Sequence, residues 1–193
     1  MNGEQVLAAF REAGALLDGH FLYASGRHGR QFLQAARVLQ FPDIAERLCA
    51  AMASRFKDAR IDLVVGPATG GIILAYETAR HLGCRAAFTE KEQDGAMALK
   101  RGFLLRQGER VLVVEDIATT GGSIKKSIAH LRQRGAQIAG VSVLIDRSSG
   151  EASFDCPYEP LARLDMQSWD PAACELCRAG KPLLDPDDIV LKS

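Results

Sequence analysis

The sequence predicts a single α/β domain built on a mostly parallel sheet with helices on both faces. From residue 61 onward, short and almost wholly apolar runs alternate with amphipathic helical segments, the pattern of strands buried on both faces. Two of these runs end in glycine-rich segments, at 66–71 and 119–123. The chain has 193 residues, 47% hydrophobic and 25% charged, which suits one globular domain with a sizeable core. Sheets of this kind bind ligands at the carboxyl ends of their strands, where both glycine-rich segments fall.

The N-terminal part predicts two helices separated by an irregular segment. A helix is expected over residues 4–17, because Val6, Phe10 and Leu17 recur at helical spacing. Residues 20–40 mix aromatic and β-branched residues around a Ser25-Gly26 turn, which favours short strands or a structured loop. Pro42 and Asp43 begin the second helix, whose apolar side chains follow at four-residue spacing: Ile44, Leu48, Met52 and Phe56.

The remaining elements follow the alternating pattern. The predicted strands are 61–65, 84–89, 110–114 and 138–146; the predicted helices are 72–82, a segment that ends near Arg134 before Gly135, and a short one from Asp170 to Gly180. The charged segment 90–101 is expected to be a hairpin with a mobile tip. It is either solvated surface or a lid over a site.

Composition limits the classes of function. Lys plus Arg and Asp plus Glu both number 24, so there is no basic excess of the kind that nucleic-acid-binding domains carry. No apolar run approaches the roughly 20 residues that span a bilayer, and the N-terminus lacks the pattern of a signal peptide. Five scattered cysteines do not suggest a disulfide framework. We therefore expect a cytoplasmic protein without a nucleic-acid or membrane partner.

The run VLVVEDIATTGGS (111–123) carries the most specific signal. A buried strand ends in Glu115 and Asp116, and a turn of small and hydroxyl residues then leads into a helix. Such a turn suits a phosphate monoester, because glycines allow close approach, successive amides point into one concavity and the helix N-terminus favours negative charge. The carboxylates suit sugar hydroxyls, a metal-bound water or positive charge on a sugar carbon. The alternative is an ordinary strand-to-helix turn with solvated carboxylates.

A second glycine-rich segment, GPATGG (66–71), ends the preceding buried strand. Free backbone amides at four positions could bind a diphosphate: Ala68, Thr69, Gly70 and Gly71. Alone, this segment would more often be a plain turn. Two phosphate-type loops one strand-helix unit apart predict a ligand with phosphates at both ends.

The 111–123 run resembles the phosphoribosyl diphosphate (PRPP) signature of the type I phosphoribosyltransferases. The resemblance implies the fold of that family, with a central mostly parallel sheet flanked by helices and a small hood. It also implies that Glu115 and Asp116 act on the ribose hydroxyls as catalytic residues, and that the loop holds the 5′-phosphate. The PRPP-binding run then comprises these two and the residues that follow them: Ile117, Ala118, Thr119, Thr120, Gly121, Gly122 and Ser123.

From about residue 6 to residue 184 the chain is similar to the orotate phosphoribosyltransferases. Within the single domain 1–193, the core is expected over about 43–147, and the hood from about 1–40 and the C-terminal segment. The segment GHFLYASGRHGRQF (19–32) resembles the part of the hood that covers the pyrimidine. This resemblance implies that three residues contact orotate: Phe32, Thr119 and Arg147. An arginine suits the orotate carboxylate, because its planar guanidinium can pair with both oxygens.

The resemblance also implies a cofactor, a loop residue and an assembly. Mg²⁺ would be bound mainly by PRPP rather than by a protein site, because Mg²⁺ keeps waters and substrate oxygens as ligands. Lys91 aligns with a family lysine that reaches the diphosphate across a homodimer interface, while Lys100 and Arg101 are candidate substitutes for other basic loop residues. The alternatives are transfer to another base, such as a purine, and a non-catalytic regulator that senses PRPP.

Cysteines and histidines suggest one further site. Cys174 and Cys177, at i and i+3, could be half of a zinc site with Cys156 as a third ligand, but no fourth ligand is evident in the sequence. Half-buried structural cysteines are the commoner alternative. The histidines are scattered without metal-binding spacing, and His28 is expected to be a solvated surface residue.

Overall fold

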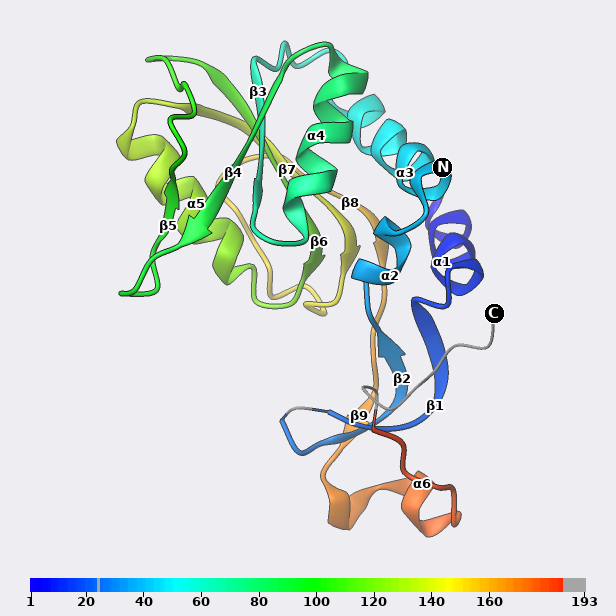
Figure 1. Cartoon of the computed structure of the whole chain (residues 1–193). Coiled ribbons are helices and arrows are strands. Elements are labelled where there is room, and N and C mark those ends of the chain that lie inside the picture. Colours follow the sequence, from blue (N-terminus) through cyan, green and yellow to red (C-terminus); the bar gives the residue numbers. More distant parts are fainter. Residues whose placement is uncertain (24, 186–193) are drawn as a thin grey trace.

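The computed structural model describes residues 1–23 and 25–185 of the chain, so the last part of the predicted domain 1–193 lies outside the described residues. Two sheets make up the described part: a six-stranded sheet with helices on both faces, and a three-stranded sheet that extends from one end of it (Figure 1). No helix among the described residues is long and apolar enough to cross a membrane.

The six-stranded main sheet has the order β5-β4-β3-β6-β7-β8. Its strands are β3 (Leu63–Pro67), β4 (Arg85–Lys91), β5 (Met97–Leu99), β6 (Arg110–Ala118), β7 (Gln137–Asp146) and β8 (Tyr158–Arg163). All pairs are parallel except β4–β5, which confirms the predicted mostly parallel sheet and the hairpin at 90–101. The edge strand β8 was not predicted.

Helices cover both faces of this sheet because its strand residues alternate between two apolar cores. Val64 and Leu112 pack with α1 (Gly3–Glu12), α3 (Pro42–Arg55) and α4 (Gly71–Leu82), whereas their neighbours Val65 and Val111 pack with α5 (Gly122–Gln133) on the other face. Alternation places one side chain in each core, so the strands read as continuous apolar runs. The glycine-rich segments both follow strands at the same edge, after β3 and β6.

The three-stranded sheet forms the hood. It has the order β1-β2-β9, with β1 (Leu16–Leu22), β2 (His28–Leu33) and β9 (Ser168–Trp169) all antiparallel. The helix α2 (Ala36–Leu39) leads from it back to α3, and α6 (Glu175–Arg178) lies at its far end (Figure 1). Residue Leu184 forms a parallel bridge with Phe21, so N-terminal and C-terminal segments meet in the hood.

Two predicted helices are wrong in extent. The helix expected over 4–17 ends at Glu12, Gly14 takes a positive φ of 60°, and Leu16 and Leu17 belong to β1. The helix expected from Asp170 to Gly180 is divided into a 3₁₀ turn (Pro171–Ala173) and the four-residue α6, because Cys174 is extended between them.

Candidate active site

The turn between β6 and α5 presents backbone amides that have no hydrogen-bond partner in the described part of the chain. Gly121 precedes the first residue of α5 and has a positive φ of 69°, and no side chain caps the helix there. A Cβ at Gly121 would overlap the ring of Phe154, so both conformation and space require glycine. The first N–H groups of a helix have no partner within it and carry partial positive charge. This turn can therefore bind an anion.

A cavity of about 280 Å³ opens over this turn. The residues that line it include the whole predicted phosphate loop and two predicted catalytic residues, and together they are Lys91, Gly95, Met97, Glu115, Ile117, Thr119, Thr120, Gly121, Gly122, Ser123, Ile124 and Lys126. The structure thus brings a concave set of amides together with one carboxylate and two ammonium groups. That composition fits a phosphorylated sugar.

The acidic pair lies at the end of β6. Glu115 is 9% exposed, and Asp116 is half-buried beside it. Burial, together with the neighbouring Asp116 charge, raises the pKa of Glu115 to about 8, and burial also raises the pKa of Asp116. Backbone amides partly compensate: Ile117 N–H donates to Asp116 Oδ1 at 2.6 Å and Asp116 N–H to Glu115 Oε1 at 3.2 Å. A ligand that brings hydroxyl groups or positive charge next to Glu115 and Asp116 would favour the ionised form of these two carboxyls.

The second loop meets the acidic pair. Gly70 lies so close to Asp116 that a Cβ at this position would overlap its carboxylate. Gly66 and Gly71 lie at the two ends of the loop, and a Cβ on either glycine would overlap the backbone of the other. The Ala68–Thr69 peptide is cis. Ala68 and Thr69 are exposed. The segment predicted to bind diphosphate is therefore next to Asp116, although it does not line the 280 Å³ cavity.

The residues predicted to contact the base are divided between core and hood. Arg147 follows β7, where its N–H donates to the Ala118 carbonyl at 2.8 Å, and its Nε is buried without a hydrogen-bond partner among the described residues. Burial lowers its pKa, and the hood residue Tyr23 interacts with it electrostatically. Phe32 lies in β2 with its ring 5.8 Å from that of Phe21. Neither Arg147 nor Phe32 lines the cavity, whereas Thr119 does.

The β4–β5 hairpin supplies Lys91 to the cavity of its own chain. Lys100 and Arg101, the candidate substitutes for other basic loop residues, instead pair with Glu92 at 2.8 Å and Glu90 at 2.8 Å on the same hairpin. In this conformation they hold the hairpin together rather than face the cavity.

Lys126 was missed by sequence reasoning. It lines the cavity, and its Nζ donates to the Gly95 carbonyl at 2.6 Å, which ties the tip of the hairpin to α5. Its position three residues after Ser123 was the available signal, because residues at i and i+3 share one face of a helix.

The predicted cysteine and histidine pattern requires correction. Cys156 packs with the α5-side core and is not a neighbour of Cys174 and Cys177. These two cysteines instead meet His20 and His28, and His28 is 6% exposed rather than solvated.

Comparisons with known proteins agree with this geometry. The phosphoribosyl transferase domain family matches residues 34–159. The orotate phosphoribosyltransferase of Acidithiobacillus ferrooxidans is 50% identical over 190 residues, covering 96% of this chain and 97% of its own. That of Caldicellulosiruptor bescii is 44% identical over 186 residues, with the same coverage of 96% and 97%.

Solved structures show the same fold. The orotate phosphoribosyltransferase of Aeropyrum pernix superposes with a TM-score of 0.66 at 30% identity, covering 82% of this chain and 93% of its own. The adenine phosphoribosyltransferase of Rhodothermus marinus gives 0.64 at 21% identity, covering 83% and 99%, so this fold is shared by enzymes named for different bases. With full-length relatives at 44% to 50% identity, the chain belongs to the orotate phosphoribosyltransferase family of the phosphoribosyl transferase domain proteins.

Proposed function

We propose that this protein transfers the 5-phosphoribosyl group from PRPP to orotate, giving orotidine 5′-phosphate and diphosphate in pyrimidine (UMP) biosynthesis. The observation that carries the proposal is the meeting of the phosphate turn, Glu115 and Lys91 around one cavity, with Gly70 against Asp116 beside it. This arrangement offers anion sites on both sides of an acidic pair. PRPP has the matching order of groups: a 5′-phosphate, a ribose and a diphosphate.

Each group of residues has one task in the reaction. The amides of 119–123 hold the 5′-phosphate, Glu115 and Asp116 accept hydrogen bonds from the ribose hydroxyls, and Ala68–Gly71 hold the diphosphate. The bond between C1 and the diphosphate oxygen breaks as a ring nitrogen of orotate bonds to C1. Diphosphate leaves with the electron pair, and the proton of that ring nitrogen passes to the leaving diphosphate or to water. The protein orients both substrates and excludes water, which would hydrolyse PRPP.

The acidic pair suits positive charge that develops on the sugar. Glu115 is buried and Asp116 half-buried, and both carboxylates have raised pKa values, so any nearby positive charge stabilises them. They therefore favour an oxocarbenium-like transition state over the ground state. The carboxylate oxygens of Glu115 and Asp116 are also ligands that suit Mg²⁺ and its bound waters. When bound with PRPP, Mg²⁺ would neutralise diphosphate charge, and Lys91 adds a cation to the cavity over the phosphate turn.

Arg147 is the proposed orotate residue. Its buried Nε has no hydrogen-bond partner among the described residues, and a substrate carboxylate would supply one. Thr119 lines the cavity near the expected base, and Phe32 offers an aromatic face from the hood. A purine has no carboxylate to pair with Arg147, which favours orotate as the acceptor.

The test is diphosphate release from PRPP and Mg²⁺ with each candidate base. Release with orotate supports the proposal, release with a purine alone would replace orotate by that purine, and no release with any base would indicate a regulator that senses PRPP. The Asp116→Asn variant should lose most of its turnover with orotate. Near-normal rates in that variant would contradict the role of the carboxylate.

A cytoplasmic homodimer is part of the same proposal. Lys91 lines the cavity of its own chain in the structure, while the resemblance implies that it crosses to a neighbouring subunit. Mixing a Lys91→Ala chain with an Asp116→Asn chain distinguishes these arrangements. Recovery of activity in the mixed dimer supports delivery across the interface, and a mixture without recovery supports delivery within one chain.

A further inference from the structure

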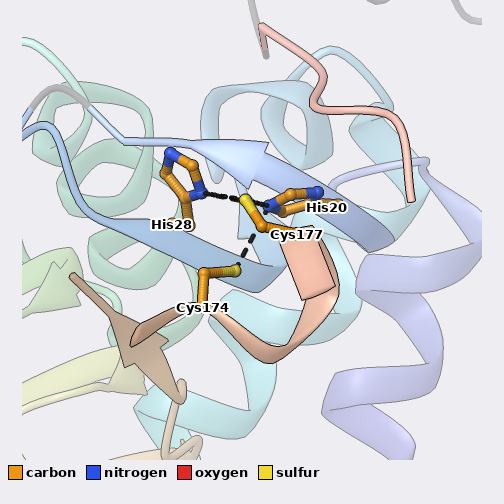
Figure 2. A group of neighbouring side chains, drawn as sticks. All are labelled: His20, His28, Cys174 and Cys177. Carbon is orange, nitrogen blue, oxygen red and sulfur yellow. Dashed lines mark hydrogen bonds between the residues drawn. The ribbon is translucent and has the colours of Figure 1, made fainter. Parts of the chain in front are cut away.

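Four side chains of metal-ligating types meet between the hood sheet and α6, at the far end of the hood. His20 comes from β1, His28 from β2, and Cys174 and Cys177 from the segment that contains α6, so residues up to 157 positions apart are brought together (Figure 2). One ligand atom from each residue lies within 4.8 Å of all the others. Figure 2 shows the four side chains directed toward one another.

The spacing of these atoms matches a tetrahedral zinc site. Zinc binds imidazole nitrogen at about 2.0–2.1 Å and thiolate sulfur at about 2.3 Å. Tetrahedral angles then separate two nitrogens by about 3.3 Å and a nitrogen from a sulfur by about 3.6 Å. Here His20 Nε2 and His28 Nδ1 are 3.1 Å apart, and three sulfur–nitrogen distances are 3.3, 3.4 and 3.8 Å.

The hydrogen bonding of His20 leaves the correct nitrogen free for a metal. Its Nδ1 lies 2.9 Å from the backbone oxygen of Lys181, which can only accept, so the proton is on Nδ1. In the neutral ring, Nε2 therefore carries a lone pair, and this atom faces Cys174, Cys177 and His28. Metal-binding histidines usually donate their other N–H to a carbonyl or carboxylate, which fixes the orientation of the ring.

The four side chains lie where the hood would otherwise need an apolar core of its own. The hood's buried Phe21, Cys174 and Leu176 belong to neither of the two main apolar clusters, and β9 contributes two residues to the sheet. His20 and Cys174 are 2% and 1% exposed. Small units with little apolar core are commonly stabilised by a metal or disulfides. Two thiolates would balance the charge of one Zn²⁺, so the buried site would be neutral.

We propose that His20, His28, Cys174 and Cys177 bind one structural Zn²⁺ that fastens the C-terminal segment to the hood sheet. All four ligands come from protein, which leaves no open position for chemistry. Among the described residues, one further group of potential ligands consists of Glu46, Glu77 and His81, and its two carboxylates already form ion pairs with Arg80 at 3.9 Å and 2.6 Å. These half-buried charges already pair with one another, so they do not require a metal.

Elemental analysis of the full chain tests the site directly. Protein produced with zinc in the medium and purified without chelators should contain about one zinc per chain. Cys177→Ser, at an exposed ligand, and His28→Gln should each lower the content at least tenfold. Cys156→Ser is the matched control, because this thiol lies outside the cluster, and it should retain zinc.

Two measurements on the unaltered chain keep the test independent of variant folding. Replacement of zinc by Co²⁺ should give the visible and thiolate charge-transfer bands of a tetrahedral sulfur–nitrogen site. Removal of the metal by a chelator should raise hydrogen exchange in 16–33 and 168–184, with little change in β6 and β7.

Three results would overturn the proposal. The first is protein without zinc that also fails to take up Zn²⁺ or Co²⁺. The second is a Cys174–Cys177 disulfide in freshly purified protein, seen as a mass lower by two hydrogens. The third is full zinc content in both ligand variants. None of these results bears on diphosphate release, so the zinc site and the proposed function can fail separately.

Discussion

Glu115 shows how a residue placed for ligand binding affects the stability of the free protein. Its pKa is raised to about 8 by burial and by the neighbouring Asp116. Between its ordinary value of about 4.3 and this raised value, the folded chain holds a proton that the unfolded chain has lost. The free energy of unfolding therefore contains a contribution that falls as pH rises through this window.

Glu115→Gln should remove that contribution. Near pH ~8.5 the free variant should be more stable than the unaltered protein by at least ~1 kcal/mol, and near pH ~5 the difference should shrink, because both side chains are then neutral. Thermal unfolding at several pH values measures this. The same variant should bind PRPP more weakly, and an identical pH slope in the two proteins would contradict the raised pKa.

Gly70→Ala tests the contact between the second loop and the acidic pair. Gly70 has helical backbone angles (φ −59°, ψ −38°), so alanine strains nothing locally, but its Cβ would overlap the Asp116 carboxylate. A displaced reacting group costs on the order of 10–100-fold in rate, and steady-state assays should show this loss with little change in unfolding temperature. Gly3→Ala is the control, because its Cβ meets only ordinary contacts at 3.7–3.8 Å.

At the scale of elements, α5 and the β4–β5 hairpin share the cavity through Lys126. Lys126→Met removes a cation that faces the phosphate turn and the bond to the Gly95 carbonyl. The KM for PRPP should rise roughly tenfold, as expected for loss of one charge-assisted contact. Hydrogen exchange at residues 92–96 should also increase.

Lys125→Met provides the matched control for this effect. The Lys125 ammonium lies 5.9 Å from the centre of the Phe154 ring, and its side chain does not line the cavity. Equal rises in KM for the two variants would indicate a general electrostatic effect, and would remove the specific role of Lys126.

The elements of the main sheet were predictable from sequence where the pattern was local. Continuous apolar runs at β3, β6 and β7 indicate strands buried on both faces. Pro42 marks the beginning of α3, and Gly135 follows the end of α5. β8 was missed because it is an edge strand that contains Pro160, and proline disfavours the assignment of a strand. The helix at 4–17 was overextended because Leu16 and Leu17 fit helical and strand periods alike.

The site residues, too, could be predicted where the pattern is local and could not where it is not. That the phosphate turn and Glu115 lie together was predictable because one contiguous run contains them, and the structure places them around one cavity. The His20–Cys174 contact joins residues 154 positions apart, a relation set by the pairing of β1, β2 and the C-terminal segment. Local spacing therefore could not reveal it, and Cys156 was chosen wrongly as a partner.

At the scale of the whole molecule, the base-binding residues join the main sheet to the hood. Arg147 extends from the end of β7, while Tyr23, which interacts with it electrostatically, belongs to the hood. Tyr23 is itself held by a hydrogen bond from its hydroxyl to the Gln31 carbonyl at 2.5 Å. The position of the hood therefore influences the surroundings of the arginine that is proposed to bind orotate.

Arg147→Gln should raise the KM for orotate roughly 10–100-fold and leave the KM for PRPP nearly unchanged, because one charged hydrogen-bonding partner of a carboxylate is lost. Steady-state kinetics with each substrate varied in turn measures both. Arg163→Gln is the control, since Arg163 ends the neighbouring strand β8 and its side chain is 70% exposed. A parallel rise in both KM values would indicate misfolding of the site rather than loss of a base contact.

The pairing of Leu184 with Phe21 fixes an order of events during synthesis on the ribosome. Strands β3 to β7, with both phosphate-type loops, emerge well before residues 168–184 complete the hood, and domains commonly fold as the chain emerges. A nascent chain therefore forms the strands and loops proposed to bind PRPP first, and completes the hood proposed to cover orotate last. Premature termination in the final stretch would yield a fragment that retains the former and lacks the latter.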